Sequence, residues 1–137
     1  MDMNQVKDFL QTHDQFVQHI GIELTEVSPG YAKAKMKIQK YHLNSVDIVQ
    51  GGAIFTLADF TFAAASNSHG TVAVGISANI FYVKATSSGT LYAEGKEISK
   101  NPKLATYLIH VTDDKNEVVA IFQGMVYRKK DPLPIKQ

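Results

Sequence analysis

The 137-residue sequence contains no cysteine and carries a net charge of only +1. The lack of cysteine excludes disulfides, thiol nucleophiles and thiolate metal sites. The near-neutral balance, with no arginine-rich arm, gives no general attraction to nucleic acid, so we expect no nucleic-acid partner. The five histidines are dispersed, none at HxxH or HExxH spacing, and no phosphate loop or dinucleotide fingerprint occurs. We therefore expect no metal site.

Segments that would send the chain to or across a membrane are also missing. The first residues, MDMNQVKDFLQ, contain neither a basic start nor an apolar core, so they do not resemble a signal peptide. The longest apolar run is interrupted by Asp59 and is too short to span a bilayer. We expect a cytoplasmic protein without membrane contact. The length, with 45% hydrophobic and 20% charged residues, predicts one globular domain over residues 1–137.

One stretch, residues 41–70, contains the most informative pattern in the chain. It starts as a polar loop, passes through Gly51 and Gly52, and becomes an apolar run of helical length. Between residues 53 and 65, Asp59 is the only ionisable side chain. An isolated charge in such a run is costly unless it is paired, neutralised or used. Asp59 either faces solvent or caps a neighbouring loop, or it performs chemistry in a partly dry site.

Hydrophobic periodicity predicts the remaining elements. A three- and four-residue apolar spacing indicates a helix over residues 4–20, capped by Asn4 and ended by Gly21. Alternating residues then predict strands, with Ala32, Ala34 and Met36 on a buried face and lysines on the other, and the C-terminal tail, 129–137, is predicted to be frayed. The predicted strands cover residues 22–25, 31–39, 71–86, 90–99, 105–112 and 117–128.

The order of these elements predicts the fold class. Short turns between the last four strands favour an antiparallel meander. A helix that is apolar nearly all round must be wrapped by other elements. We therefore predict an α+β protein in which a curved antiparallel sheet of about six strands surrounds one long central helix, with a second helix at the N-terminus.

The start of the central helix offers hydrogen-bond donors. The backbone N–H groups of Gly51 and Gly52 are expected among the unpaired donors of the first turn, and glycine lets a ligand approach closely. A helix N-terminus also carries partial positive charge. These features suit a carbonyl oxygen that becomes an oxyanion. The alternative is that the two glycines only permit a tight turn.

The spacing of Gly51 and Asp59 has a geometric consequence. They are eight residues apart on one helix, about 12 Å along its axis at 1.5 Å per residue. One carbonyl must lie about 3 Å from both its donor and its attacking group. If both residues act on one substrate, Asp59 must therefore face the helix start of a second copy, and a two-fold axis creates two equivalent sites.

Asn44, Gln50, Gly51, Gly52 and Asp59 resemble a known motif. Their spacing, Asn-x5-Gln-Gly-Gly-x6-Asp, is similar to that of the hotdog-fold acyl-CoA thioesterases of the phenylacetate-degradation type, which have His-Gly-Gly at the centre. Ser77 lies eighteen residues after Asp59, where the family has a strand serine or threonine. The resemblance extends over nearly the whole chain, including the order of elements.

The resemblance implies a role for each matching residue. Asp59 would attack the thioester carbonyl or deprotonate the attacking water, and the Gly51 N–H would stabilise the oxyanion. Asn44 and Gln50 would orient the thioester or the water, and Ser77 would hydrogen-bond the water or the carboxylate. Gln50 replaces the family histidine and cannot be a general base, although it can donate a hydrogen bond. Without the resemblance, Asn44 reads as a turn former and Ser77 as a small strand residue.

The resemblance also implies an acyl-CoA substrate, no cofactor beyond the coenzyme A of the substrate, and a homodimer that pairs into a homotetramer. Gly52, Phe55, Tyr82 and Lys84 are the candidate substrate-binding residues, although the aromatic ones also suit a core. Other lysines near strand ends could meet the phosphates of coenzyme A: Lys96, Lys100 and Lys103. Two alternative functions stay open. One is a non-catalytic acyl-CoA-binding protein, and the other is a hotdog enoyl-CoA hydratase, whose chemistry needs a histidine.

Overall fold

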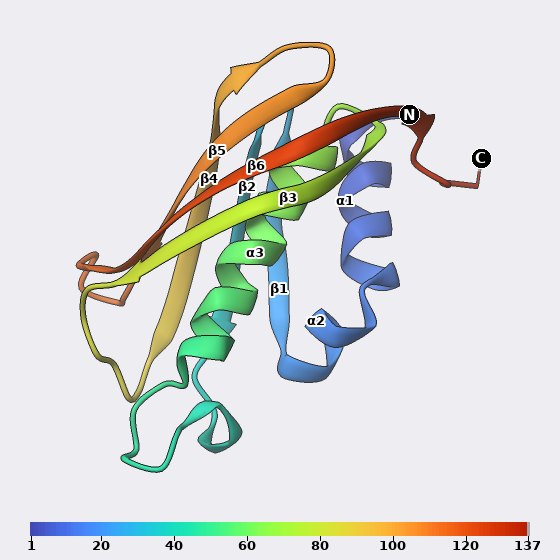
Figure 1. Cartoon of the computed structure of the whole chain (residues 1–137). Helices are drawn as coiled ribbons and strands as arrows, with labels where there is room; N and C mark the ends of the chain where they lie inside the picture. Colours follow the sequence, from blue (N-terminus) through green and yellow to red (C-terminus); the bar gives the residue numbers. More distant parts are fainter. Residues whose placement is uncertain (137) are drawn as a thin grey trace.

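The computed structural model describes residues 1–136, in which a six-stranded antiparallel sheet curves around one long helix, α3 (Gly51–Asn67; Figure 1). The strand order across the sheet is β1-β2-β4-β5-β6-β3. The predicted fold class is confirmed. Along the chain, the strands are β1 (Ile22–Ser28), β2 (Tyr31–Lys37), β3 (Thr71–Tyr82), β4 (Thr90–Lys100), β5 (Leu104–Thr112) and β6 (Val118–Pro132).

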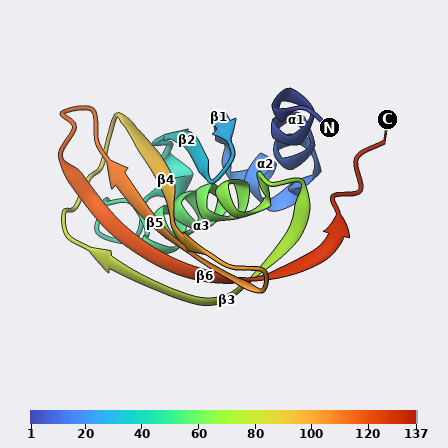
Figure 2. The ribbon, with the colours of Figure 1, turned by 90° about the horizontal axis from the view of Figure 1, so that it is seen from above.

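Helix α3 lies inside the arc of the sheet, as the view from above shows (Figure 2). Leu57, Ala58 and Phe62 are buried, and most of the helix surface contacts strands. The exposed positions, Gly52 and Asp59, form a narrow stripe with half-buried residues between and beyond them. A helix apolar on almost every side is stable here because strands cover all but that stripe. The stripe is therefore the part of α3 that can meet a ligand or another molecule.

Strand β2 shows why the sheet has one buried and one solvated face. Ala32, Ala34 and Met36 are buried under α3, while the intervening lysines are exposed. The predicted alternation is confirmed, because side chains on a strand point alternately to its two faces. Burying each apolar side chain contributes about 25 cal/mol per Å² of surface removed from water.

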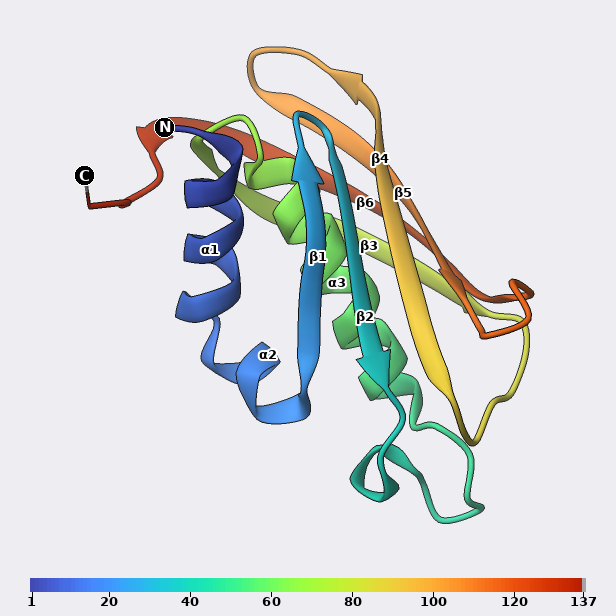
Figure 3. The same cartoon turned by 180° about the vertical axis from the view of Figure 1, so that it is seen from behind.

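The N-terminal segment forms two helices where the sequence predicted one. Helix α1 (Met3–His13) ends at Asp14, whose carboxylate accepts from the Val17 N–H and begins α2 (Gln15–Ile20). The predicted cap, Asn4, is wrong: Asp2 caps α1 through a reciprocal pair of hydrogen bonds with Gln5. The predicted end at Gly21 is confirmed by its left-handed backbone, with φ 77°. Figure 3 shows α1 beside β1.

The C-terminal segment is more ordered than the sequence suggested. Strand β6 continues to Pro132, and Leu133 is buried, with its N–H bonded to the Gly70 carbonyl oxygen at 2.9 Å. The predicted fraying of 129–137 is therefore wrong for its first residues, because Leu133 reaches the core; Gln137 lies outside the described residues. None of the helices within residues 1–136 is long and apolar enough to cross a bilayer.

Candidate functional site

Helix α3 begins with a free hydrogen-bond donor. Gln50 is the N-cap, and its side-chain oxygen accepts from the Gly52 N–H at 3.3 Å. The Gln50 carbonyl oxygen accepts from the Ala53 N–H at 2.9 Å, which fixes the peptide that carries the Gly51 N–H. No group within residues 1–136 accepts from that N–H. It points from the positive end of the helix dipole and is available to an oxyanion.

The loop before α3 is folded by Asn44 and His42. The Asn44 side-chain oxygen accepts from the N–H groups of Val46 at 3.0 Å and Ile48 at 3.3 Å. Asn44 therefore forms a turn through this oxygen, as one of the two sequence interpretations expected. Its NH₂ group makes no hydrogen bond within residues 1–136. That group is therefore free to reach a ligand, which is the role that the resemblance implies for Asn44.

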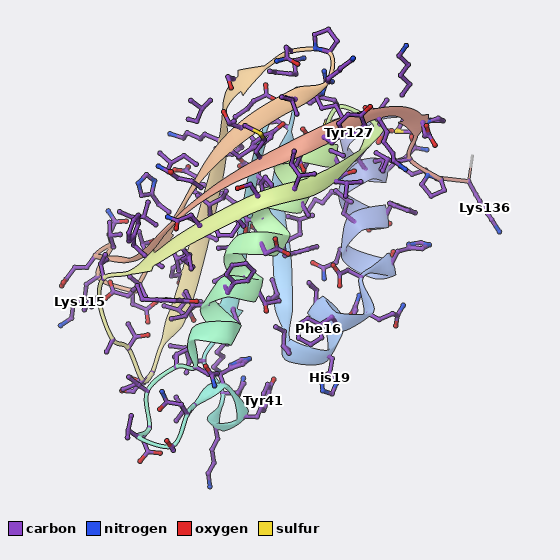
Figure 4. All side chains as sticks on the ribbon, viewed as in Figure 1. Phe16, His19, Tyr41, Lys115, Tyr127 and Lys136 are labelled. Atoms are coloured by element: carbon purple, nitrogen blue, oxygen red, sulfur yellow. The ribbon has the colours of Figure 1, made fainter. Side chains whose placement is uncertain are left out.

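His42, which the sequence reasoning gave no role, is buried in this loop. Its Nδ1 accepts from the Gln39 N–H at 2.9 Å, and its Nε2–H donates to the Ile20 carbonyl oxygen at 2.8 Å. Both ring nitrogens are thus used, which assigns a neutral tautomer with the proton on Nε2. The neighbouring Tyr41, labelled in Figure 4, belongs to the same loop, and a Cβ added to Gly21 at the end of α2 would lie 3.4 Å from its hydroxyl. His42 therefore fastens the loop to the end of α2.

A cavity of about 380 Å³ opens beside the helix start. It collects residues from the loop, from α3 and from the end of β3 and the segment that follows. Four of the predicted site residues thus meet here, although they are up to forty positions apart in the chain. The lining consists of Asn44, Ile48, Val49, Gly51, Ile54, Tyr82, Val83, Lys84 and Ala85.

Tyr82 and Lys84 are both engaged within the protomer. The Tyr82 hydroxyl donates to the Gly51 carbonyl oxygen at 3.0 Å. The Lys84 ammonium contacts Asp113 at 2.5 Å and Glu117 at 3.1 Å. The hydrogen bond to Asp113, followed by that to Glu117, raises the pKa of Lys84. Lys84, which lines the cavity, is therefore charged, but Asp113 and Glu117 already match its charge.

Asp59 lies on the exposed stripe of α3, two turns beyond Gly51, and does not line the cavity. Its carboxylate has no hydrogen-bond or ion-pair partner among the described residues. The protein around the Asp59 carboxylate removes part of its water, which disfavours the charged form and raises its pKa. The negative charge of Asp14, at the cap of α2, raises the pKa of Asp59 further. An unpaired carboxylate with a raised pKa is typical of a chemical role. Asp14 was missed because only the packing of α2 on α3 brings it near.

Three further predicted residues lie elsewhere. Gly52 and Gln50 are exposed at the helix start, beside the cavity. The Phe55 ring packs edge-on against Phe122 at 5.5 Å, so it faces the sheet as a core residue does. Within one protomer, neither Phe55 nor the exposed amide of Gln50 is among the cavity-lining residues.

Ser77 lies on β3, in register with Met125 of β6. The next residue, Ala78, pairs with Gly124, where an added Cβ would meet the Phe62 ring of α3. Strand alternation therefore turns Ser77 toward the outer face of the sheet, where it lines a separate groove of about 420 Å³. The structure does not bring Ser77 to Asp59 within one protomer.

Comparison with known proteins identifies the family. The family model of the thioesterase superfamily matches residues 47–120, from the loop before α3 to β6. The chain belongs to the thioesterase superfamily.

Relatives within this superfamily extend over nearly the whole chain. A protein of Archaeoglobus fulgidus, named only as a proposed esterase, is 41% identical over 96% of this chain and 86% of its own length. The acyl-coenzyme A thioesterase PaaI of Escherichia coli is 29% identical over 85% of this chain and 84% of its own length. These matches confirm the resemblance to the phenylacetate-degradation type of thioesterase.

Solved structures of the superfamily have the same fold. The E. coli PaaI structure superposes with a TM-score of 0.90 at 25% identity, over 95% of this chain and 97% of that one. A mutant form of the phenylacetic acid degradation protein PaaI from Thermus thermophilus gives 0.81 at 30% identity, over 85% and 100%. The chain is therefore a thioesterase with the hotdog fold.

Proposed function

We propose that the protein hydrolyses acyl-CoA thioesters to a free acid and coenzyme A. The observation that carries the proposal is the unpaired Gly51 N–H at the start of α3, beside a cavity that Asn44 also lines. A carbonyl oxygen at this position would receive a fixed donor and the positive end of a helix dipole. The name of the E. coli relative, an acyl-coenzyme A thioesterase, supports this substrate class.

In the proposed reaction, the thioester carbonyl oxygen accepts a hydrogen bond from the Gly51 N–H. Asp59 either attacks the carbonyl carbon or removes a proton from the water that attacks it. The C–S bond then breaks and coenzyme A leaves as its thiolate, which takes up a proton. If Asp59 is the nucleophile, water hydrolyses the resulting anhydride. A thioester is already activated, so a carboxylate and an oxyanion hole are sufficient without a further cofactor.

Two copies of the chain are needed to assemble this site. Gly51 and Asp59 lie on one continuous helix, about 12 Å apart along its axis, so they cannot reach the same carbonyl. Strand β3 supplies a surface for the second copy: it is the edge of the sheet and exposes Val74 and Ile76. A long exposed edge favours pairing with another strand. We propose an edge-paired homodimer, with two dimers forming a homotetramer.

Release of free thiol from short, medium and aryl acyl-CoAs tests the activity. Asp59→Asn should lower kcat/KM by roughly 10²- to 10⁴-fold, the usual contribution of a positioned acid or base. Asp8→Asn, a change of the same kind at an exposed position on α1, is the matched control. Native-like turnover by Asp59→Asn, with an unchanged far-UV spectrum, would rule out the mechanism.

Subunit mixing tests the shared site. Asp59→Asn and Gly51→Ala chains, each nearly inactive alone, are unfolded together and refolded as a mixture. Half of the dimers then combine both chains, and each of these holds one site with native Asp59 and native Gly51. The mixture should recover about a quarter of wild-type activity. Activity equal to the mean of the two parents would show that one chain supplies both groups.

The same experiments separate the alternatives. A non-catalytic acyl-CoA-binding protein would bind the substrates without releasing thiol. Hydratases of this fold usually use a histidine paired with a carboxylate, and Gln50 stands where the motif would supply that histidine. Conversion of an enoyl-CoA, followed by absorbance, tests this alternative, and no change eliminates it. Single-turnover hydrolysis in ¹⁸O-labelled water distinguishes the two roles of Asp59, because only a nucleophilic carboxylate incorporates the label into its own peptide.

A further inference from the structure

Tyr82 holds the first residue of α3 in two ways. Its hydroxyl donates to the Gly51 carbonyl oxygen at 3.0 Å, from a position 31 residues further along the chain. Its ring covers the same residue: a Cβ added to Gly51 would lie 3.3 Å from the ring carbon that carries the hydroxyl. At Gly52, an added Cβ would meet nothing within 4 Å. The contact is therefore specific to Gly51.

Gly51 is a residue that needs such support. It begins the helix next to a second glycine, and glycine has the largest conformational freedom of any residue. The peptide before Gly51 is fixed by the bond from the Ala53 N–H to the Gln50 carbonyl oxygen. The peptide after it carries the carbonyl that Tyr82 binds. The N–H of that same peptide, on Gly52, donates to the Gln50 side-chain oxygen at 3.3 Å. Tyr82 thus adds a second restraint, from β3, to the peptide that follows Gly51.

The hydroxyl of Tyr82 is suited to act as a donor. Burial raises the pKa of Tyr82, so the hydroxyl keeps its proton throughout the neutral range. The ring also lines the cavity, so a direct substrate contact is the competing role. The two roles differ in what they predict, because a substrate contact changes KM, whereas a fixed donor matters most when negative charge develops in the transition state.

We propose that Tyr82 is a positioning residue that acts through Gly51, by fixing the start of α3 so that the Gly51 N–H points at the reacting carbonyl oxygen. The proposal rests on the proposed thioesterase mechanism and adds a part to it. A residue of the edge strand β3 would then help to hold the oxyanion donor, which belongs to a different element, α3.

Tyr82→Phe tests the proposal because it removes the hydroxyl and keeps the ring. The net value of one hydrogen bond, about 0.5–1.5 kcal/mol, corresponds to a fall in kcat of roughly 2- to 10-fold, with KM changed less than twofold. The ¹⁵N relaxation order parameter of the Gly51 amide should fall as well. The matched control is Tyr127→Phe, which removes a hydroxyl that makes no hydrogen bond among residues 1–136.

A second variant keeps the test decisive. Gly51→Ala places a methyl group 3.3 Å from the Tyr82 ring, a tight contact that disturbs the same support. The losses of kcat in Gly51→Ala and in Tyr82→Phe should therefore not multiply in the double variant. An unchanged kcat in Tyr82→Phe, or a raised KM with unchanged kcat, overturns the proposal. If the order parameter falls in Tyr82→Phe but Gly51→Ala keeps full activity, the restraint is real and the proposed oxyanion role of Gly51 is wrong.

Discussion

The two ends of α3 differ in how their polar groups are used. At the N-terminal end, one side-chain cap at 3.3 Å serves Gly52, and the Gly51 N–H is left for a ligand. At the C-terminal end, Asn67 accepts from the Ala73 N–H at 2.9 Å, and Ser68 accepts from the Gly30 N–H at 2.7 Å. One end is kept open beside a cavity, and the other is bonded to the sheet.

A charged cluster completes the bonded end. The Glu97 carboxylate contacts His69 at 2.8 Å and receives the Tyr107 hydroxyl at 2.6 Å. His69, just after the end of α3, thus reaches across to β4. Burial alone opposes ionisation of Glu97, but the hydrogen bonds from Tyr107 and His69 outweigh it and lower its pKa. A helix anchored at one end can leave donors unpaired at the other, because packing and the anchor supply the stability.

The largest effect is expected at the open end. Gly51→Ala should lower kcat by about 10- to 100-fold, because the added Cβ lies 3.3 Å from the Tyr82 ring, so that the ring or the backbone carrying the proposed oxyanion donor must shift. Gly52→Ala should cost much less, since its Cβ enters open space. Steady-state kinetics and urea unfolding on both variants check this. Equal losses of activity in the two variants would remove the distinction between these glycines.

An intermediate effect, on stability rather than rate, is expected at the bonded end. Glu97→Gln should lower the free energy of unfolding by about 1–2 kcal/mol at pH 7, the difference between charged and neutral hydrogen bonds. Since folding lowers the pKa of Glu97 from its usual value of 4.5, its contribution to stability is present above about pH 4.5 and is lost as pH falls through the folded pKa. Urea unfolding at several pH values measures this.

The control for that change is Glu23→Gln, at an exposed position of β1 with no ion pair within residues 1–136. Activity per folded Glu97→Gln molecule should equal that of the unchanged protein. A large fall in kcat at full folding would mean that the two ends of α3 are coupled, and the contrast between them would not hold.

The smallest effect is expected from Asp14, between the two ends. Asp14→Asn preserves a helix cap but removes the negative charge that raises the pKa of Asp59. If the reaction needs ionised Asp59, activity rises with pH through that pKa, so the variant should keep its activity to lower pH. The acidic limb of the kcat/KM profile and a ¹³C titration of the Asp59 carboxyl both report the shift.

Asp2→Asn is the matched control, because Asp2 also caps a helix but exerts no charge effect on Asp59. Identical acidic limbs in the two variants would contradict the influence of Asp14. A shift of the carboxyl titration without a shift of the rate profile would instead contradict the catalytic role of Asp59.

Local patterns predicted much of the fold. The alternation of Ala32, Lys33 and Ala34 identified β2, and the apolar run with one carboxylate identified α3, because both periods are set by backbone geometry. Details that depend on competing side chains were predicted less well. Asp2 and Gln5 form a better cap than Asn4, and Asp14 divides one expected helix into two.

The candidate site shows the same division. The family resemblance grouped Asn44, Gly51 and Asp59 in one site. Helix spacing predicted that one helix cannot bring Asp59 to the Gly51 N–H of its own chain. It could not predict that Lys84 pairs with Asp113, or that Ser77 faces the outer side of the sheet, because these follow from the register of distant strands.

The sequence by itself determined the elements, the position of the lone carboxylate and the glycines at the helix start, because these depend on neighbours within a few residues. Only the tertiary structure decided that Tyr82 covers Gly51, that Asp14 acts on Asp59 and that Glu97 anchors the far end of α3. Those contacts join residues 28 to 45 positions apart, and no local periodicity specifies them. They arise when the curved sheet closes around the helix.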